Sequence, residues 1–313
     1  MSRLRHDPLT GEPILFAPER RERPNAFEGG VPQDDNGMCP FCPGNEHETP
    51  PEVARTGTAA RWDVRVVPNR YPAVGQHGLR GIHEVVIEAP RHEATFASMS
   101  SAQRVRVLRA YRERFAAHRR DRSIRHLVIF RNDGARSGQS LGHPHAQIIG
   151  LPFIPDRIRR EASLMRSRRR KNLPCLVCQE LGDAERTIDA NEAFAALAPK
   201  ASRSPYALRI VPMRHAPDFG QTDDRELELL DAILGRVLGA INAALAQPPW
   251  NMVIQSAPMR TASADAFHWW IDVLPRLTTD GGFELATGIP INIVTPESAA
   301  AELRAALRAQ ETR

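Results

Sequence analysis

Two imidazoles stand two residues apart within residues 138–147, where His143-Pro144-His145 leads into an apolar stretch. Because side chains alternate along a strand, His143 and His145 are expected to point to the same side of the strand that follows. Gly138 leaves the backbone free to turn and Pro144 restricts φ, so the segment can curl close to a ligand before the strand begins. This spacing predicts a ligand-binding site, and the alternative is a polar loop with two incidental histidines.

The four cysteines form two Cys-x-x-Cys pairs, and each pair is followed by an Arg-His dipeptide and then by a histidine that opens an apolar stretch. In a reducing compartment such pairs hold metal more often than they form disulfides. A Cys2His2 set completes the tetrahedral coordination of Zn²⁺ and leaves no position for a substrate. We therefore predict two structural Zn²⁺ sites, one made of Cys39, Cys42, His92 and His143 and one made of Cys175, Cys178, His215 and His268. Buried thiols and surface histidines at strand ends are the alternative.

The two halves differ at the position that could do chemistry. Where the first half has His143-Pro144-His145, the second has His268-Trp269-Trp270, so the ligand histidine is kept and the other imidazole becomes an indole. Only the first half can therefore supply a nucleophilic imidazole at this place. The two tryptophans are predicted to be core or pocket walls, with stacking on a base as the alternative.

The elements that must position these residues occur in the same order in both halves. Periodicity of two or of about 3.6 predicts strands and helices as follows: strands 64–67 and 84–88, helix 101–119 and strands 126–130 and 146–151, then strand 207–211, helix 226–245 and strands 252–255 and 267–274. Such a repeat indicates an α/β architecture of two α+β halves, each a mostly antiparallel sheet with a crossing helix. We expect the halves to be residues 1–172, which include a basic arm, and residues 173–313.

Composition excludes some classes of protein and leaves others open. With 42% hydrophobic and 25% charged residues the chain is typical of globular proteins, and it has no apolar run of the roughly 18 residues that cross a bilayer. The polar, basic start lacks a secretory signal, so we expect a cytoplasmic protein with no membrane partner. Much of the net charge of +5 comes from the arginine-rich stretch 157–171, which is expected to be a solvated helix or loop. Phosphate-bearing small molecules are favoured over nucleic acid as anionic partners.

Several motifs together resemble a known family. The His-Pro-His-x-Gln stretch, the two Cys-x-x-Cys halves and the tail 281–288 with Ile291-Asn292 are similar to galactose-1-phosphate uridylyltransferase and its relatives in the histidine-triad superfamily. The similarity spans nearly the whole chain, and the tail and second zinc set resemble most the branch that contains ADP-glucose phosphorylase. The resemblance implies two histidine-triad-like repeats and a homodimer.

The resemblance also implies a mechanism, which is nucleotidyl transfer in two steps through a covalent nucleotidyl-histidine. His145 would be the nucleophile, because an imidazole with a pKa near 6.5 is largely neutral at pH 7 and keeps a lone pair. Gln147, two residues further along the strand, would point to the same side and donate its amide to a phosphate oxygen.

The family's ligand contacts can be carried over to matching positions of this sequence. The nucleotide and phosphate contacts fall on Arg20, Arg23, Asn69, Asn132, Gly138 and Ser140, and the hexose contacts fall on Phe283 and Glu284. Plainer alternatives are turn residues for the asparagines, solvated side chains for the arginines and a tail strand for the last two.

We therefore expect an enzyme that transfers UMP between UDP-glucose and a hexose 1-phosphate such as galactose 1-phosphate. The alternative within the family is transfer of AMP from ADP-glucose to inorganic phosphate. A nucleotide-sugar hydrolase would keep the histidine and lack a sugar acceptor. A non-enzymatic zinc protein that binds nucleic acid through its arginines would instead lose affinity steeply as salt rises.

Overall fold

The computed structural model describes residues 39–58, 60–75, 78–262, 264–279, 281–288 and 291–311, together with the backbone of two short strands near the start of the chain. These two strands, β1 (Arg3–His6) and β2 (Pro13–Phe16), pair with each other in antiparallel fashion. Arg20 and Arg23 lie outside the described residues.

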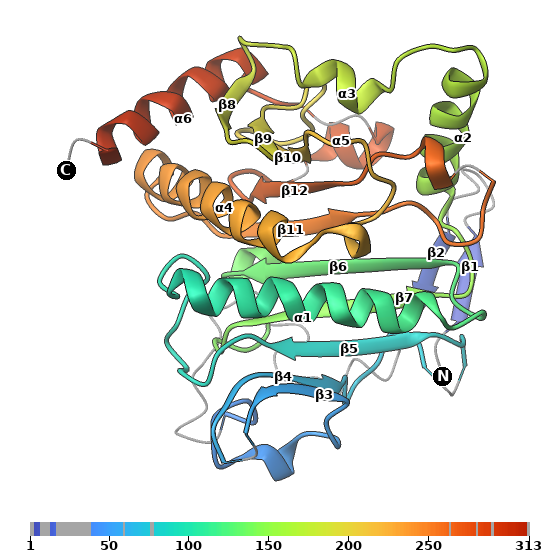
Figure 1. Ribbon diagram of the computed structural model, residues 1–313, viewed down its shortest axis with the longest axis vertical. Helices are drawn as coiled ribbons and strands as arrows, with labels where there is room; N and C mark the ends of the chain where they lie inside the picture. Colours follow the sequence, from blue (N-terminus) through green and yellow to red (C-terminus); the bar gives the residue numbers. More distant parts are fainter. Residues whose placement is uncertain are drawn as a thin grey trace.

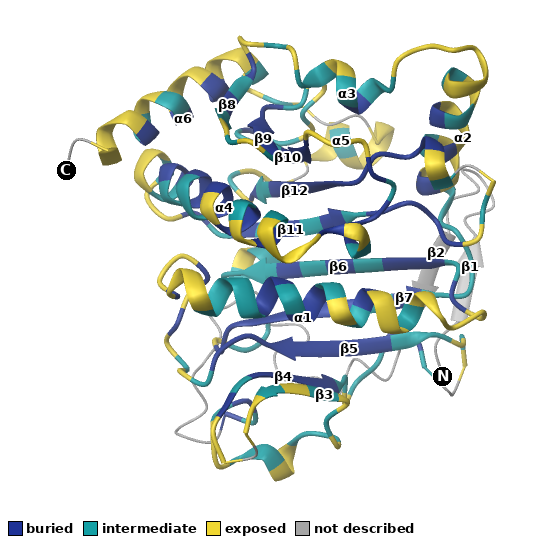
Figure 2. Cartoon of the chain, viewed as in Figure 1, coloured by how far each residue is buried: buried dark blue, intermediate teal, exposed yellow. Residues whose placement is uncertain are grey.

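One ten-stranded sheet, antiparallel at every pairing, forms the centre of the described structure, in the strand order β3-β4-β5-β7-β6-β11-β12-β10-β9-β8 (Figure 1). Its strands are β3 (Ala54–Gly57), β4 (Trp62–Pro68), β5 (Ile82–Ile87), β6 (His126–Asp133), β7 (His145–Leu151), β8 (Thr187–Ala190), β9 (Phe194–Leu197), β10 (Leu208–Pro212), β11 (Trp250–Gln255) and β12 (Trp270–Pro275). The inner strands are largely buried, as Figure 2 shows.

Two long helices lie across one face of the sheet (Figure 1). α1 (Ser101–Arg119) begins after Ser100, whose side chain accepts the backbone N–H of Gln103 at 3.2 Å. α4 (Asp224–Leu245) begins with a capping box, in which the side chains of Asp223 and Glu226 each accept the other's backbone N–H. These caps satisfy N–H groups that have no partner inside the helix, so they explain where both helices start.

The helices determine which face of the sheet can carry a polar site. Ala146 and Ile148 of β7 belong to the apolar core that also contains Tyr111 and Phe115 of α1. Because side chains alternate along a strand, His145 and its neighbours at even spacing face the other side. The site therefore lies on the face that α1 and α4 leave uncovered.

The remaining helices lie at the C-terminal half of the sheet or at its edge. They are α2 (Asp156–Arg170), α3 (Leu176–Glu180), α5 (Gly282–Thr287) and α6 (Pro296–Glu311). α6 packs against α4 and β8. The arginine-rich stretch forms α2, which buries Ile158, Ala162 and Met165 and leaves most of its arginines exposed. None of the described helices has the length and apolar character needed to span a membrane.

The ten strands fall into two groups with the same internal order. The first group lies in the order β3-β4-β5-β7-β6 and the second in the order β8-β9-β10-β12-β11, so β6 and β11 join the halves as antiparallel neighbours. α1 follows β5 and α4 follows β10 along the chain. The predicted α+β fold of two similar halves, each an antiparallel sheet with a crossing helix, is confirmed. The boundary between residues 172 and 173 stays a prediction.

A buried histidine at the start of β6 predicts how stability depends on pH. His126 is 3% exposed, its Nδ1 has no hydrogen-bond partner among the described residues, and burial lowers its pKa to about 4. Between that value and the unfolded value of about 6.5 the unfolded chain binds more protons, so stability falls as the pH is lowered. The shift corresponds to a loss of roughly 3 kcal/mol between pH 7 and pH 4.

Urea unfolding of wild type and His126→Leu across this pH range tests the prediction, and the variant is expected to lose less stability on acidification. His47→Leu is the matched control, because the His47 side chain is 71% exposed and should leave the pH dependence unchanged. Equal pH slopes for wild type and His126→Leu would contradict the assignment.

Candidate active site and metal groups

His145 opens β7 and lines a cavity on the uncovered face of the sheet, where it is 5% exposed. Its Nδ1 lies 2.8 Å from the carbonyl oxygen of His143. A carbonyl oxygen only accepts hydrogen bonds, so Nδ1 carries the proton and the lone pair of the neutral imidazole is on Nε2. Nε2 is therefore the atom that can act as a nucleophile.

The cavity beside His145 is lined by both apolar and polar residues. The apolar ones include Pro40, Phe41, Val67, Val85 and Leu141, and the polar ones include Asn69, Ser140, His145 and Gln147. The Phe41 ring meets the His145 imidazole edge to face, with 5.4 Å between their centroids. Apolar walls with a few convergent polar groups are typical of sites for small organic ligands, and this combination suits an aromatic base joined to phosphate.

Asn132 and Gly138 shape the loop that precedes the histidines. Gly138 has a φ of 90°, a conformation that favours glycine, and its carbonyl accepts a hydrogen bond from Asn132 Nδ2 at 3.2 Å. Asn251 of the second half donates to Asn132 Oδ1 at 2.8 Å and to the Ser137 carbonyl at 2.8 Å. In this structure both polar atoms of the Asn132 carboxamide therefore bind protein groups, and Asn132 is not among the residues that line the cavity.

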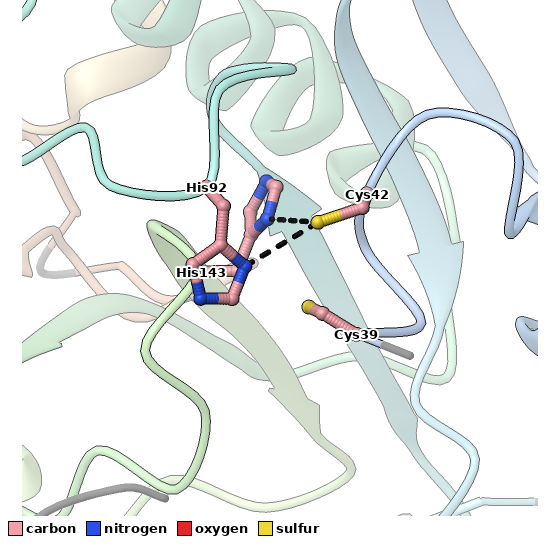
Figure 3. Close-up of side chains that lie close together, drawn as sticks. All are labelled: Cys39, Cys42, His92 and His143. Atoms are coloured by element: carbon pink, nitrogen blue, oxygen red, sulfur yellow. Dashed lines mark hydrogen bonds between the residues drawn. The ribbon is translucent and has the colours of Figure 1, made fainter. Parts of the chain in front are cut away.

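The first predicted zinc set is brought together beside this site. The ligand atoms of Cys39, Cys42, His92 and His143 all lie within 4.8 Å of one another, and Figure 3 shows both imidazoles turned toward Cys42. The Cys42 Sγ lies 3.3 Å from Nδ1 of His92 and 3.6 Å from Nδ1 of His143. Nε2 of His143 binds the Ala89 carbonyl at 2.7 Å, which leaves Nδ1 directed at the thiols. Burial lowers the pKa of His143 to about 4, so it is neutral at pH 7, which is the form that ligates metal.

The second set has the same arrangement. The ligand atoms of Cys175, Cys178, His215 and His268 also lie within 4.8 Å of one another. Nδ1 of His215 and of His268 lie 3.5 Å and 3.2 Å from the Cys178 Sγ, and their Nε2 atoms contact backbone carbonyls at 3.2 Å and 3.0 Å. Two thiols and two carbonyl-oriented imidazoles fit a tetrahedral metal ion of borderline softness, so both groups can hold one.

At the counterpart of the His145 position in the second half, Trp270 packs among other side chains. Trp270 stacks on Phe267 with 5.3 Å between ring centroids, and the Arg209 guanidinium lies 4.5 Å from the centre of its ring. The indole N–H donates to Asp272 Oδ2 at 2.8 Å, and Asp272 also binds Arg209. The tryptophan is thus a packed wall, and this position offers no imidazole.

The predicted hexose contacts lie elsewhere on the chain. Phe283 is 50% exposed on α5, which Figure 1 places beside the C-terminal half of the sheet, away from β7. Glu284 accepts the Gly281 N–H at 3.0 Å, and neither residue lines the cavity at His145. The alternative of a tail strand is wrong, because these residues form a helix.

The sequence patterns missed a buried residue that contacts the cavity wall from behind Gln147. His83 of β5 is 5% exposed, and its Nε2 lies 2.8 Å from Oε1 of Gln147. A histidine that shares one face of the strand with Val85 and Ile87 is the signal that could have marked a buried polar residue, whereas its partner Gln147 is 64 residues away and cannot be read from a local pattern.

Comparisons with known proteins agree with one another. The sequence model described as "Galactose-1-phosphate uridyl transferase, N-terminal domain" matches residues 1–155. ADP-glucose phosphorylase of Arabidopsis thaliana is 31% identical to this chain over 324 residues, which cover 96% of this chain and 92% of the relative. Galactose-1-phosphate uridylyltransferase of Thermotoga maritima is 27% identical, with 97% and 98% covered.

A solved structure gives the same relationship in three dimensions. The crystal structure of the Arabidopsis thaliana ADP-glucose phosphorylase with bound ADP-glucose superposes with a TM-score of 0.81 at 30% sequence identity. The match covers 97% of this chain and 99% of that chain, so the similarity extends over both halves.

Proposed function

Because the chain belongs to the galactose-1-phosphate uridylyltransferase family of nucleotidyltransferases, we propose that it transfers UMP between UDP-glucose and a hexose 1-phosphate such as galactose 1-phosphate. The observation that carries the proposal is the bond from His145 Nδ1 to the His143 carbonyl, which leaves the lone pair on Nε2 in the wall of the cavity.

In the first step, Nε2 of His145 attacks the α-phosphorus of the nucleotide sugar. A P–N bond forms, the bond from the α-phosphorus to the bridging oxygen breaks, and the sugar 1-phosphate leaves with the electron pair. The imidazole gains a positive charge, and its Nδ1–H stays bonded to the His143 carbonyl, where such a bond strengthens as the ring becomes cationic. In the second step a phosphate oxygen of the acceptor attacks phosphorus, the P–N bond breaks and neutral His145 is restored.

Other residues of the cavity suit the charge that develops on phosphorus. The Gln147 amide can donate to a non-bridging phosphate oxygen, which carries more charge in the transition state. Ser140 and Asn69 lie in the same wall and can bind the phosphate or the ribose. The family resemblance also assigns Arg20 and Arg23 to the phosphates, and Asn132 and Gly138 to the same end of the substrate, where their hydrogen bond would shape the loop that presents Ser140.

A second candidate reaction is transfer of AMP from ADP-glucose to inorganic phosphate. It is favoured by the ADP-glucose phosphorylase of Arabidopsis thaliana, which is 31% identical over 96% of this chain. Both reactions use the same covalent chemistry and differ in the base and in the acceptor.

Incubation with UDP-glucose or ADP-glucose, each radiolabelled in the α-phosphate, tests the function and separates the two reactions. We expect acid-labile label on the protein with one donor and release of glucose 1-phosphate before any acceptor is added. Product analysis after addition of galactose 1-phosphate or inorganic phosphate then identifies the acceptor. No label from either donor would contradict the proposal.

We propose Zn²⁺ as the metal of both Cys2His2 groups, because thiolate and imidazole donors in a closed tetrahedral set are typical of structural zinc. In the first half Cys39, Cys42, His92 and His143 would hold it, and the ion would supply shape and no open coordination position. The purified protein is expected to contain about two zinc ions per chain, and Cys175→Ser about one. Elemental analysis by mass spectrometry measures both, and an unchanged content in Cys175→Ser would contradict the second site.

We also propose that the protein is a cytoplasmic homodimer in which the tail of one protomer reaches the hexose end of its partner's cavity. The support is that Phe283 and Glu284, the hexose contacts implied by the family, are remote from the cavity of their own chain, and that Leu285 and Ile293 nearby are each 77% exposed. The four free thiols fit a reducing compartment. Light scattering of the purified protein and microscopy of a tagged chain test these two points.

A further inference from the structure

His83 lies on β5 beside β7, and both strands contribute residues to the cavity wall. In the antiparallel pairing of β5 with β7, His83 stands opposite Ile149 and Val85 stands opposite Gln147. Residues two apart on one strand share a face, as do residues opposite each other on neighbouring strands, so His83 and Gln147 lie on the same face of the sheet. Both side chains are 5% exposed, so their polar atoms must be satisfied by neighbours.

The neighbours of His83 determine its tautomer. The backbone N–H of Ala73 lies 3.0 Å from His83 Nδ1. A backbone amide nitrogen can only donate, so Nδ1 is the unprotonated acceptor and the proton of the neutral ring is on Nε2. Nε2–H then donates to Gln147 Oε1, which lies 2.8 Å away.

This bond determines how the Gln147 carboxamide is turned. A carboxamide has its acceptor oxygen and its NH2 donor on opposite branches, and rotation by half a turn exchanges them. Because His83 engages the oxygen, the NH2 branch is the one left for the cavity that Gln147 lines. In the reversed orientation the Gln147 NH2 would join the Asn69 NH2 at His83 Nε2, so the ring N–H would lose its acceptor, and the Gln147 oxygen would face a negatively charged phosphate.

His83 also holds a second part of the wall. Its backbone carbonyl accepts the Asn69 N–H at 2.8 Å, while its Nδ1 accepts the Ala73 N–H, so both ends of the segment 69–73 are fixed on this one residue. Asn69 Oδ1 accepts the Tyr71 N–H at 2.8 Å. Asn69 Nδ2 lies 3.1 Å from His83 Nε2, and because the amide NH2 and the protonated ring nitrogen are both donors, this contact is not a hydrogen bond, and the Nε2 proton is directed at Gln147 Oε1. Asn69 and Tyr71 both line the cavity.

We propose that His83 is a positioning residue for nucleotidyl transfer, which holds the Gln147 carboxamide with its N–H side toward the phosphate that His145 attacks. The inference rests on the proposed function, since it presupposes a phosphate beside His145. In this proposal His83 acts through Gln147 and makes no contact with the reacting atoms.

Rapid-quench kinetics with the labelled donor that the wild type accepts test the inference. His83→Leu is expected to slow formation of the nucleotidyl-enzyme roughly 10- to 100-fold, with the dissociation constant of the donor changed much less. His83→Gln should recover most of the rate, because its amide N–H can donate from a similar position. His126→Leu is the matched control, since it also replaces a buried histidine on the same sheet and should keep the wild-type rate.

A double-mutant cycle separates positioning from a general structural effect. Adding His83→Leu to Gln147→Ala is expected to cost less than about 3-fold, because the carboxamide to be oriented is already gone. Losses that multiply in the double variant would overturn the inference.

Nitrogen NMR of histidine-labelled resting protein provides a readout that does not depend on activity. The expected spectrum has the His83 proton on Nε2, and a proton on Nδ1 would overturn the inference whatever reaction the protein catalyses. Failure of the proposed function shows itself differently, as a lack of label on the wild type.

Discussion

His145→Ala is expected to form no nucleotidyl-enzyme and to lose roughly 10⁴-fold or more of its transfer activity, because the atom that bonds to phosphorus is removed. The alanine side chain leaves the backbone of β7 in place, so the loss should not come from unfolding. Rapid-quench labelling measures the covalent intermediate, and steady-state transfer measures the overall rate. Binding of the nucleotide sugar should persist, because the apolar wall at Phe41, Val67 and Val85 is unchanged.

Two controls make this result specific. The metal content and the far-UV circular dichroism of His145→Ala should equal those of wild type, since the metal ligands and the strands are retained. Gln147→Ala should lose activity by roughly 10²- to 10³-fold and still form labelled protein, because it removes a donor and not the nucleophile. Label on His145→Ala at the wild-type level would show that another residue is the nucleophile.

The ligand sets could be predicted from sequence because each ligand is a recognisable residue type and the halves repeat. The order Cys-x-x-Cys, Arg-His, then a histidine at a strand start occurs twice. His143 and His268 take equivalent positions in this repeat, and this marks both as ligands. The structure brings each set together. The sequence also separates the predicted ligand His143 from the predicted nucleophile His145. The second half keeps a histidine at the ligand position, His268, and has Trp270 at the place of His145.

His83 and Asn251 could not be found in the same way, because their roles depend on partners far along the chain. His83 binds Gln147, which is 64 residues away, and Asn251 binds Asn132, which is 119 residues away and in the other half. No local pattern reports such a contact. It follows from the register of β5 with β7 and of β6 with β11, which only the folded sheet determines.

Periodicity predicted the two long helices, α1 and α4, and the inner strands whose apolar runs are clear, such as β6 and β7. β9 was missed because its sequence, Phe-Ala-Ala-Leu, consists mainly of residues that favour helices. It is a strand because it pairs with β10 on one side and β8 on the other, with all four residues buried. Tertiary pairing outweighs local propensity there, as it often does in short strands.

The side chain and the backbone carbonyl of His143 together link the first Cys2His2 group to His145, the proposed nucleophile. Its Nδ1 lies with the thiols, its Nε2 is fixed on the Ala89 carbonyl, and its own carbonyl accepts from His145 Nδ1 at 2.8 Å. The first Cys2His2 group therefore sets the position of the acceptor that selects the reactive tautomer of His145. The second group has no such link, because the corresponding side chain is Trp270.

Because of this difference, matched substitutions in the two groups are expected to lower the activity by very different amounts. Cys42→Ser is expected to lower the rate of nucleotidyl-enzyme formation roughly 10- to 100-fold, as loss of groups that orient a site commonly does. Cys178→Ser removes the equivalent thiol of the other half and should cost far less activity. Both variants should lose about one metal ion per chain and become less stable, since binding of a structural metal contributes to folding.

Kinetics are therefore compared at a temperature where circular dichroism shows both variants folded, with metal content measured on the same samples. Equal losses of rate in the two variants would mean that the metals act only on global stability. A loss confined to Cys42→Ser would mean that the backbone of His143 transmits the geometry of the metal group to the reactive nitrogen.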